Sequence, residues 1–317
     1  MKILGAGMAG CLMGVLNPGA KIYEANNKLP DTHRAVLRFR DEKISKATGI
    51  PFKKVKVYKT IWADGKERML GPQWINQYSK KVTGRFQARS IINLDTVERY
   101  IAPSNFHQIL ADMCEGNINL GMEVTAISKH AIVFNHCDEV NRDFEPVVST
   151  MPMPIMAKIL EIDTYGEPFK HQPITVTRFK VTDCDVYQTI YYPKNDTPAY
   201  RATLTGDDLI IESIGDWTPD TIHPILESFG INIHQLDLGV HSAESIRAEQ
   251  KYGKISPIDE SVRRDFMLKL TTEHNIYSVG RFACWRNILL DDVYEDNFKV
   301  RAMINSDPYT VFKGART

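Results

Sequence analysis

The chain has 317 residues, of which 43% are hydrophobic and 25% are charged, and its formal net charge is zero. This composition is ordinary for a globular protein, and the length is sufficient for two lobes rather than one minimal core. No apolar run approaches the roughly 20 residues that cross a bilayer, and the start lacks the features of a signal peptide, so we expect a cytoplasmic protein without membrane contact.

The five cysteines and nine histidines show none of the spacings that mark a disulfide framework or a metal site. No cysteine pair has C-x-x-C spacing and no histidine pair has H-x-x-x-H spacing. An odd number of separated cysteines is typical of a reducing compartment. We therefore expect no structural metal.

The first 24 residues predict a β-α-β unit. A short strand over residues 2–4 runs into "GAGMAG", and an apolar helix over 11–16 follows, which ends at "NPG" because proline and glycine break helices. A second strand over 21–23 ends at Glu24. This is the context in which G-x-G-x-x-G spacing indicates a dinucleotide site, and a glycine-rich turn in another α/β protein is the alternative.

Each glycine of this motif has its own physical role. Gly5 permits the tight turn out of the strand, Gly7 lets the backbone approach a pyrophosphate, and Gly10 lets the helix pack closely on the sheet. The helix N-terminus offers free N–H groups and a positive dipole end to the phosphates. Glu24, nineteen residues after Gly5, is placed to accept hydrogen bonds from ribose hydroxyls.

Charge is unevenly distributed along the chain. Residues 43–89 contain twelve Lys and Arg against two Asp and Glu, a net of +10, whereas residues 137–245 contain seven against eighteen, a net of −11. Aromatic residues are interleaved with the basic ones, a pattern in which cations meet phosphates and rings stack on bases. Residues 43–89 are therefore a candidate surface for nucleic acid or a phosphate-bearing substrate, and a solvated lobe balanced by the acidic segment is the alternative.

The later elements alternate between helices and strands. In chain order we expect a hairpin over 58–69, a helix over 95–115 broken at Pro103, strands at 124–127 and 131–134, a strand ending at Thr150, and a helix over 155–160. Residues 173–213 are rich in β-branched and aromatic residues and predict a mostly antiparallel sheet. Helices over 218–229 and 260–271, a final strand and a terminal helix from about 290 complete the chain. The nucleotide-binding domain is thus expected to come from both ends, with the antiparallel lobe inserted.

Four stretches together resemble the FAD-dependent amine oxidase superfamily, and within it most closely the UDP-galactopyranose mutases. They are "GAGMAG…KIYEA", "PVVSTMPMP", "IYYPKNDTPAYRATL" and "YSVGRFACWRNILLDDVYED". The resemblance implies an α/β fold, with a Rossmann-type FAD-binding domain of the glutathione-reductase kind and an inserted antiparallel-sheet substrate lobe. On this basis we divide the chain into FAD-binding segments at 1–40, 93–165 and 251–317, a basic, aromatic-rich insertion at 41–92, and the substrate lobe at 166–250.

The resemblance also implies which residues contact FAD. These are Gly5, Gly7, Gly10, Glu24, Val124, Thr150, Gly280, Arg281 and Asp291. The glycines would hold the pyrophosphate, Glu24 the adenosine ribose, and Val124 would lie beside the adenine. Gly280, Arg281 and Asp291 would lie at the ribityl and diphosphate end of the flavin, where the dipole of the last helix contributes.

Substrate residues follow from the same resemblance. The candidate catalytic residues are Arg201, His33 and Trp285, and the substrate-binding candidates are Tyr192, Tyr200, Arg201 and Arg38. Arginine binds phosphate through its bidentate fork, although Arg201 on a strand is alternatively a cross-strand partner. Trp285 forms either a wall of the site or part of the core, and His33 is either an acid–base group or an ordinary loop histidine.

The segment after Glu24 departs from the family pattern. It lacks the usual double glycine, and "RAVLRFR" at 34–40 stands where mutases carry a Gly-x-His-x-Phe-His run. We therefore predict an FAD-dependent oxidoreductase that takes a hydride from an amine-bearing (C–N) substrate, which carries phosphate or is a nucleotide in one version of the hypothesis. The alternatives are a mutase-like sugar-nucleotide isomerase that uses reduced FAD, and a non-catalytic FAD-binding interaction protein.

Overall fold

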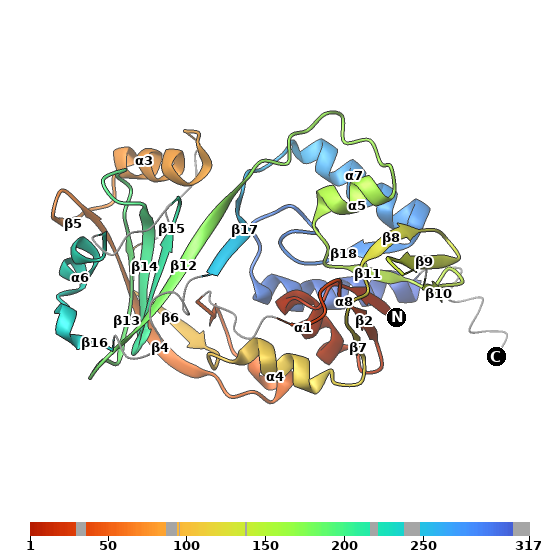
Figure 1. Cartoon of the computed structure of the whole chain (residues 1–317), viewed down its shortest axis with the longest axis horizontal. Helices are drawn as coiled ribbons and strands as arrows, with labels where there is room; N and C mark the ends of the chain where they lie inside the picture. The colour runs from red at the N-terminus through yellow and green to blue at the C-terminus, as the bar shows by residue number, and fades with distance from the viewer. Residues whose placement is uncertain are drawn as a thin grey trace.

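The structure is a computed structural model that describes residues 1–29, 36–86, 94, 96–136, 138–215, 221–237 and 248–306. It has two lobes, one built on a parallel sheet and the other on a large twisted sheet (Figure 1). Within the described ranges, no helix combines the length and apolar character that a membrane span requires.

The first lobe is organised around a five-stranded parallel sheet with the order β18-β11-β1-β2-β7. Its strands are β1 (Lys2–Leu4), β2 (Lys21–Tyr23), β7 (Ile118–Asn119), β11 (Val147–Ser149) and β18 (Ile276–Ser278). The central strand β1 pairs with β2 on one side and with β11 on the other. Residues from the start, middle and end of the chain therefore share one sheet, as the sequence predicted.

Helices and a small sheet cover the two faces of this parallel sheet. One face packs against α1 (Met8–Leu16), α2 (Lys43–Thr48), α4 (Phe106–Met113) and α8 (Leu290–Ser306). The other packs against α5 (Met153–Ile159), α7 (Glu260–His274) and a three-stranded sheet of β8 (Val124–Ile127), β9 (Ala131–Phe134) and β10 (Glu139–Asn141). Both interfaces are apolar, so each strand is covered on two sides, as parallel sheets require.

The second lobe is a ten-stranded sheet with the order β16-β12-β15-β14-β13-β4-β6-β3, to which β17 and β5 add at the sides. Its strands are β3 (Arg38–Phe39), β4 (Lys53–Ala63), β5 (Lys66–Arg68), β6 (Val97–Ile101), β12 (His171–Val181), β13 (Val186–Tyr191), β14 (Ala199–Gly206), β15 (Asp208–Ser213), β16 (Leu236–Asp237) and β17 (Ala248–Ile255). The pairings between its described strands are antiparallel, except that β13 pairs with β4 in parallel. The predicted mostly antiparallel sheet is confirmed.

One helix covers each face of the large sheet (Figure 1). The helix α3 (Pro72–Thr83) packs Tyr78 and Val82 against Tyr191 and Ile210 of the sheet. The helix α6 (His223–Phe229), followed by the short 3-10 helix η2 (Ile233–Gln235), packs on the opposite face. We call these two faces of the sheet the α3 face and the α6 face. Because side chains alternate along a strand, the position of a residue determines the face from which its side chain projects.

The predicted helix over 95–115 is wrong in its first half. Residues 97–101 form the strand β6, which pairs with β4 and β3, and only the part after Pro103 is helical. The sequence "VERYI" offers β-branched and aromatic side chains to a sheet, and the pairing with β4 outweighs its local helical character. The hairpin over 58–69 is confirmed, with Asp64 and Gly65 at positive φ in its turn.

Candidate functional site

The glycine loop between β1 and α1 is tightly packed at two positions and open at the third. A Cβ on Gly10 would lie 1.9 Å from Gly5 O, and a Cβ on Gly5 would lie 2.5 Å from Thr150 Oγ1. Gly5 also has a φ of 97°, which suits only glycine, and its N–H donates to Tyr23 O at 2.7 Å. By contrast, a Cβ on Gly7 would meet nothing within 4 Å. The packing of the protein itself therefore requires Gly5 and Gly10, whereas the space beside Gly7 is open.

Glu24 binds the same loop from the end of β2. Its Oε2 accepts a hydrogen bond from Ala6 N–H at 2.8 Å. Its Oε1 accepts from the Asn26 backbone N–H at 3.0 Å and from the Asn26 side chain at 2.6 Å. An ionised carboxylate has about four acceptor positions, so Glu24 can accept further hydrogen bonds from ribose hydroxyls while it holds the loop.

The carbonyl group of Ala6 is held from below by two buried side chains. The Sγ of Cys11 donates to Ala6 O at 3.1 Å, and Nε2 of His107 lies 3.0 Å from the same oxygen. Because a carbonyl oxygen can only accept, this contact places the His107 proton on Nε2. Burial raises the pKa of Cys11 to about 12, so the thiol stays protonated and can donate. Sequence reasoning did not single out His107, although a histidine on the apolar face of a helix is a usable signal.

Thr150 and Gly280 border the glycine loop from the neighbouring strands. Thr150 follows β11, and its Oγ1 donates to Leu4 O at 2.9 Å. Gly280 follows β18 with a φ of 94°, and a Cβ there would lie 3.0 Å from Ala9 Cβ at the start of α1. Both predicted positions therefore lie beside the N-terminus of α1, at the carboxyl ends of parallel strands, where ligands bind in α/β sheets.

Asp291 lies in the first turn of α8, and only one of its two carboxylate oxygens has a hydrogen-bond partner among the described residues. Its Oδ1 accepts from Arg40 N–H at 2.8 Å, while its Oδ2 is buried without a hydrogen-bond partner among the described residues. Burial raises the pKa of Asp291. An acceptor left in this state favours a donor from a ligand, such as a hydroxyl group. The open cradle at Gly7 and this oxygen are the two features that fit a dinucleotide.

Val124 and Arg281 lie on other elements of the same lobe. Val124 begins β8 and is buried against the apolar cluster under the parallel sheet. Arg281 follows Gly280, and its Nη2 donates to Gly253 O at 3.1 Å. Their roles at the cofactor stay predictions.

Arg201 lies on the α3 face of the large sheet and is paired with a carboxylate. It stands opposite Glu212 in the register of β14 and β15, and both guanidinium Nε and Nη2 donate to that carboxylate, the latter at 2.7 Å. The hydroxyl of Tyr200 donates to Glu212 Oε1 at 2.9 Å. Despite burial, Glu212 holds the pKa of Arg201 well above its usual value. The cross-strand alternative is therefore realised, and the sequence signal for Glu212 was a carboxylate inside the apolar run "LIIES".

Arg38 lies close by and has no carboxylate partner in the described part of the chain. Its Nη1 donates to Thr189 Oγ1 at 2.7 Å, and its Nη2 donates to Leu204 O at 2.6 Å. Burial, followed by the nearby positive charge of Arg201, lowers the pKa of Arg38 to about 10. A half-buried guanidinium held only by neutral acceptors attracts an anion. Of the two arginines, Arg38 is the better anion anchor.

Three predicted site residues are buried in the protein. Trp285 is 1% exposed, packs edge-on against Phe169, and donates its indole N–H to Ser256 O at 3.0 Å. Tyr200 is fully buried under Lys254, and Tyr192 lies on the α6 face with its hydroxyl 2.6 Å from Ser228 Oγ. The structure thus buries all three side chains, and their roles at a substrate site stay predictions. His33 lies outside the described residues.

The basic segment 43–89 is partly neutralised within the structure. Its ion pairs to carboxylates are Lys43–Glu295, Lys46–Glu42, Lys53–Asp185, Lys54–Glu98 and Arg68–Asp64. Two aromatic side chains of this segment are exposed to solvent, Tyr58 at 55% and Phe86 at 66%. Lys80 Nζ lies 5.2 Å from the centre of the Phe86 ring. Nucleic-acid binding stays a prediction.

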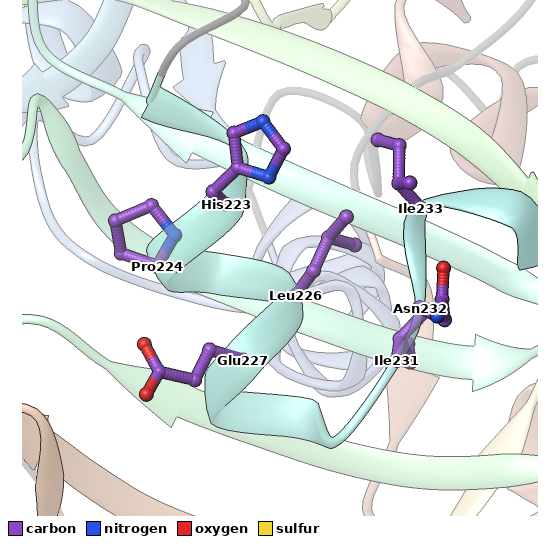
Figure 2. A pocket seen from close by; sticks show the side chains of 7 residues that line it. All are labelled: His223, Pro224, Leu226, Glu227, Ile231, Asn232 and Ile233. Atoms are coloured by element: carbon purple, nitrogen blue, oxygen red, sulfur yellow. The ribbon is translucent and has the colours of Figure 1, made fainter.

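A hollow of about 450 Å³ lies on the outer side of the sheet lobe, far from the glycine loop. Figure 2 shows its lining, with His223, Pro224 and Glu227 on α6 and Ile231, Asn232 and Ile233 on the segment that follows. Over the described ranges, no group of three or more His, Cys, Asp or Glu side chains is arranged to hold a metal ion. This hollow brings no catalytic set together.

Comparison with known proteins establishes the fold. No protein-family model matches the chain, and no curated protein matches it in sequence. A structure of reduced UDP-galactopyranose mutase matches with a TM-score of 0.70 at 14% identity, over 95% of this chain and 94% of that one.

Two further solved structures share the same architecture. A probable FAD-dependent monooxygenase from Pseudomonas aeruginosa matches with a TM-score of 0.54 at 12% identity, over 95% of this chain and 83% of that one. A putrescine oxidase matches with a TM-score of 0.57 at 9% identity, over 96% and 98%. This chain therefore has the α/β fold that these proteins share, with a Rossmann-type domain and a large sheet inserted into it.

Proposed function

We propose that this chain binds FAD at the glycine loop and acts as an FAD-dependent oxidoreductase. The observation that carries the proposal is the open backbone at Gly7, in a loop whose other two glycines are filled by the protein's own atoms. The fold similarity to a probable FAD-dependent monooxygenase and to two further enzymes supports FAD as the dinucleotide. Bound FAD supplies an acceptor for a hydride, and the protein supplies position and electrostatics.

The residues present fit the parts of the cofactor. The N–H groups at the start of α1 suit the pyrophosphate, and α1 adds the positive end of its dipole. Glu24 has acceptor positions to spare for the adenosine ribose, and the buried Oδ2 of Asp291 suits a hydroxyl donor from the ribityl chain. Thr150 and Gly280 keep the loop in shape from both sides.

We propose oxidation of a C–N bond as the reaction. In this reaction a hydride leaves the carbon that bears the nitrogen, the two electrons go to FAD, and the substrate becomes an iminium ion. The state of Arg201 favours this choice over a sugar-nucleotide reaction, because its Nε and Nη2 groups already form a bidentate pair with Glu212 and are not free to hold a diphosphate.

A mutase-like isomerisation with reduced FAD is the second candidate. Two observations favour it: the fold similarity to UDP-galactopyranose mutase covers nearly the whole of both chains, and Arg38 has no carboxylate partner among the described residues. In this version Arg38, rather than Arg201, would hold a phosphate of the substrate.

Cofactor binding is tested first, on purified protein and two glycine variants. We expect visible flavin absorbance and release of FAD on denaturation. Gly7→Ala should lose much of the FAD while the melting temperature of the apoprotein stays close to that of the wild type, since the added Cβ meets no protein atom within 4 Å. Gly116→Ala is the control, because Gly116 has a φ of 77° in a distant turn, so the change costs some stability and spares FAD. A colourless protein that binds no added FAD contradicts the proposal.

Oxygen separates the two reactions once FAD is bound. In an amine oxidase, the substrate bleaches the visible absorbance of the flavin when oxygen is absent, and hydrogen peroxide is released when air is admitted. A mutase requires prior reduction of the flavin and converts UDP-galactopyranose into an isomer without net oxidation. Bleaching by an amine panel supports C–N oxidation, and isomer formation by the reduced protein supports the second candidate instead.

A further inference from the structure

A second hollow, of about 260 Å³, lies where the two lobes meet. Its floor is the α3 face of the large sheet, and its walls are residues 36–37 and 101–104. Residues 101–104 lead from β6 into α4, the path by which the chain passes from the sheet lobe to the other lobe in Figure 1. Junctions of this kind are common places for small-molecule sites.

Strand register places several polar side chains together on this floor. Asp208 on β15 stands opposite Thr205 of β14 on one side and opposite Lys180 of β12 on the other. Arg178 lies two residues before Lys180 on the same strand, so it projects from the same face of the sheet. Arg178, Lys180, Thr205 and Asp208 all line the hollow.

Three polar atoms of this group are buried and unsatisfied. Arg178 Nε, Thr205 Oγ1 and Asp208 Oδ1 have no hydrogen-bond partner within the described residues. Asp208 Oδ1 lies 3.8 Å from Arg178 Nε, which is beyond hydrogen-bond distance. Buried polar groups without partners are rare in native proteins, so a donor and a hydroxyl left in this state point to an acceptor group brought by a ligand.

The fixed charges around the hollow balance one another. Lys180 Nζ lies 2.8 Å from Asp207 Oδ1 and 3.2 Å from Asp208 Oδ1. Together with Arg178 the group contains two cations and two anions. A ligand with a net charge would leave one charge of the pocket uncompensated, whereas a ligand with one charge of each sign leaves none.

We propose that this hollow binds a small zwitterion, a molecule with an amino and a carboxylate group on one short carbon skeleton. The carboxylate accepts hydrogen bonds from Arg178 Nε and Thr205 Oγ1, and the ammonium group donates to Asp208. Apolar side chains of Val36, Pro103 and Ile210 line the remaining wall and suit the carbon skeleton. The site involves no residue of the glycine loop, so it stands whether or not FAD binds.

Calorimetry on the full-length protein with three matched probes tests this inference. The probes are leucine, isoamylamine, which lacks the carboxylate, and 4-methylpentanoate, which lacks the amine. We expect leucine to bind at least tenfold more tightly than either single-charge probe, since only leucine meets both charges of the pocket. Equal affinities for leucine and one single-charge probe, or no binding of leucine, overturn the proposal.

Variants identify the groups that bind each end. Arg178→Gln should weaken leucine and 4-methylpentanoate at least tenfold and leave isoamylamine unchanged, whereas Asp208→Asn should weaken leucine and isoamylamine only. Arg264→Gln, at an exposed position of α7, is the control and should leave all three affinities unchanged. Loss of all three probes to the same extent in both pocket variants overturns the assignment of the two ends.

A third variant guards against effects on folding. Thr205→Val removes a hydroxyl that has no partner in the described structure, so the melting temperature should stay the same or rise. Leucine affinity should nevertheless fall about three- to tenfold, because the carboxylate loses one donor. Unchanged leucine affinity in this stably folded variant contradicts the role of Thr205.

Discussion

Arg201 and Glu212 face each other across β14 and β15 and share two hydrogen bonds on a largely buried part of the sheet. Tyr200 donates a third hydrogen bond to the same carboxylate, and the Lys254 ammonium lies 4.2 Å from the centre of the Tyr200 ring. A residue that the sequence offered as a substrate anchor is thus part of a network inside the protein. Its first role is in stability.

Glu212→Gln should destabilise the protein strongly. The substitution leaves the half-buried Arg201 without its counter-charge, and breaking one side of a buried ion pair costs about 3–5 kcal/mol. Urea unfolding followed by circular dichroism measures the change. The double variant Arg201→Met with Glu212→Leu should recover much of the loss, because it removes both charges. A double variant that is less stable than the single one contradicts this account.

The same pair predicts how stability depends on acid pH. Although burial disfavours its charged form, Arg201 lowers the pKa of Glu212 from 4.5 to about 2. A carboxyl group with a lowered pKa contributes stability that is complete above pH 4.5 and is lost as the pH falls towards 2. Urea midpoints at pH 6, 4 and 2.5 should therefore fall more steeply for the wild type than for Glu212→Gln. Parallel curves would show that the pair does not cause the acid sensitivity.

Gly10→Ala should damage the fold itself, unlike a substitution at Gly7. Its Cβ would lie 1.9 Å from Gly5 O, which is backbone and cannot rotate away. We expect a loss of about 3 kcal/mol or more, at the upper end of what overpacking costs. Thermal melting of the apoprotein measures it, with Gly7→Ala as the matched control. If Gly10→Ala has the same melting temperature as Gly7→Ala, α1 and β1 are not packed as described.

His107→Ala should weaken FAD binding through the shape of the loop. The variant removes one of the two buried donors to Ala6 O and leaves only the weaker thiol of Cys11, and the loss of one hydrogen bond costs about 0.5–1.5 kcal/mol. FAD retention during gel filtration and the melting temperature of the apoprotein are both measured. His107→Gln, which keeps a donor, should restore part of the FAD affinity. No rescue by glutamine would mean that the ring's packing matters and its hydrogen bond does not.

The cysteines should differ widely in reactivity. Burial raises the pKa of Cys11 and of Cys284 to about 12, whereas Cys184 is partly exposed. Because the thiolate is the reactive form, a disulfide reagent at pH 8 should label Cys184 quickly and the two buried thiols only after unfolding. Mass spectrometry of timed samples identifies the labelled sites. Rapid labelling of Cys284 would mean that the region after β18 opens to solvent.

The nucleotide-binding unit could be predicted because its information is local. The first strand, the glycine turn, the helix and the second strand with its terminal Glu24 all lie within 24 residues. Each of these elements is determined by residues close to it in the sequence. The antiparallel strands over 173–213 also followed from their composition, but the sequence did not show that β4, β5 and β6 join the same sheet. In contrast, the strand β6 depends on β4, about forty residues earlier, and its own five residues do not determine their partner.

The sequence could not predict how deeply individual side chains are buried. Trp285, Tyr200 and Tyr192 are aromatic residues near family motifs, and the motif alone does not distinguish a pocket wall from a core position. The pairing of Arg201 with Glu212 requires the register of two strands joined by a hairpin turn. The same register creates the cluster of Arg178, Thr205 and Asp208, which no linear motif marks.

The pairing of the parallel sheet determines the order in which the protein can fold during synthesis. Lys2 pairs with Val147, and Val147 pairs with Ile276. The strand β1 soon meets β2, but it must wait for nearly half the chain before its other neighbour, β11, exists, and β11 waits for most of the rest. By contrast, the strands β13–β15 are joined by short hairpins and leave the ribosome before β18. We expect these hairpins to form early, and the pairing of β18 with β11 to complete the nucleotide-binding lobe last, as a slow, long-range step.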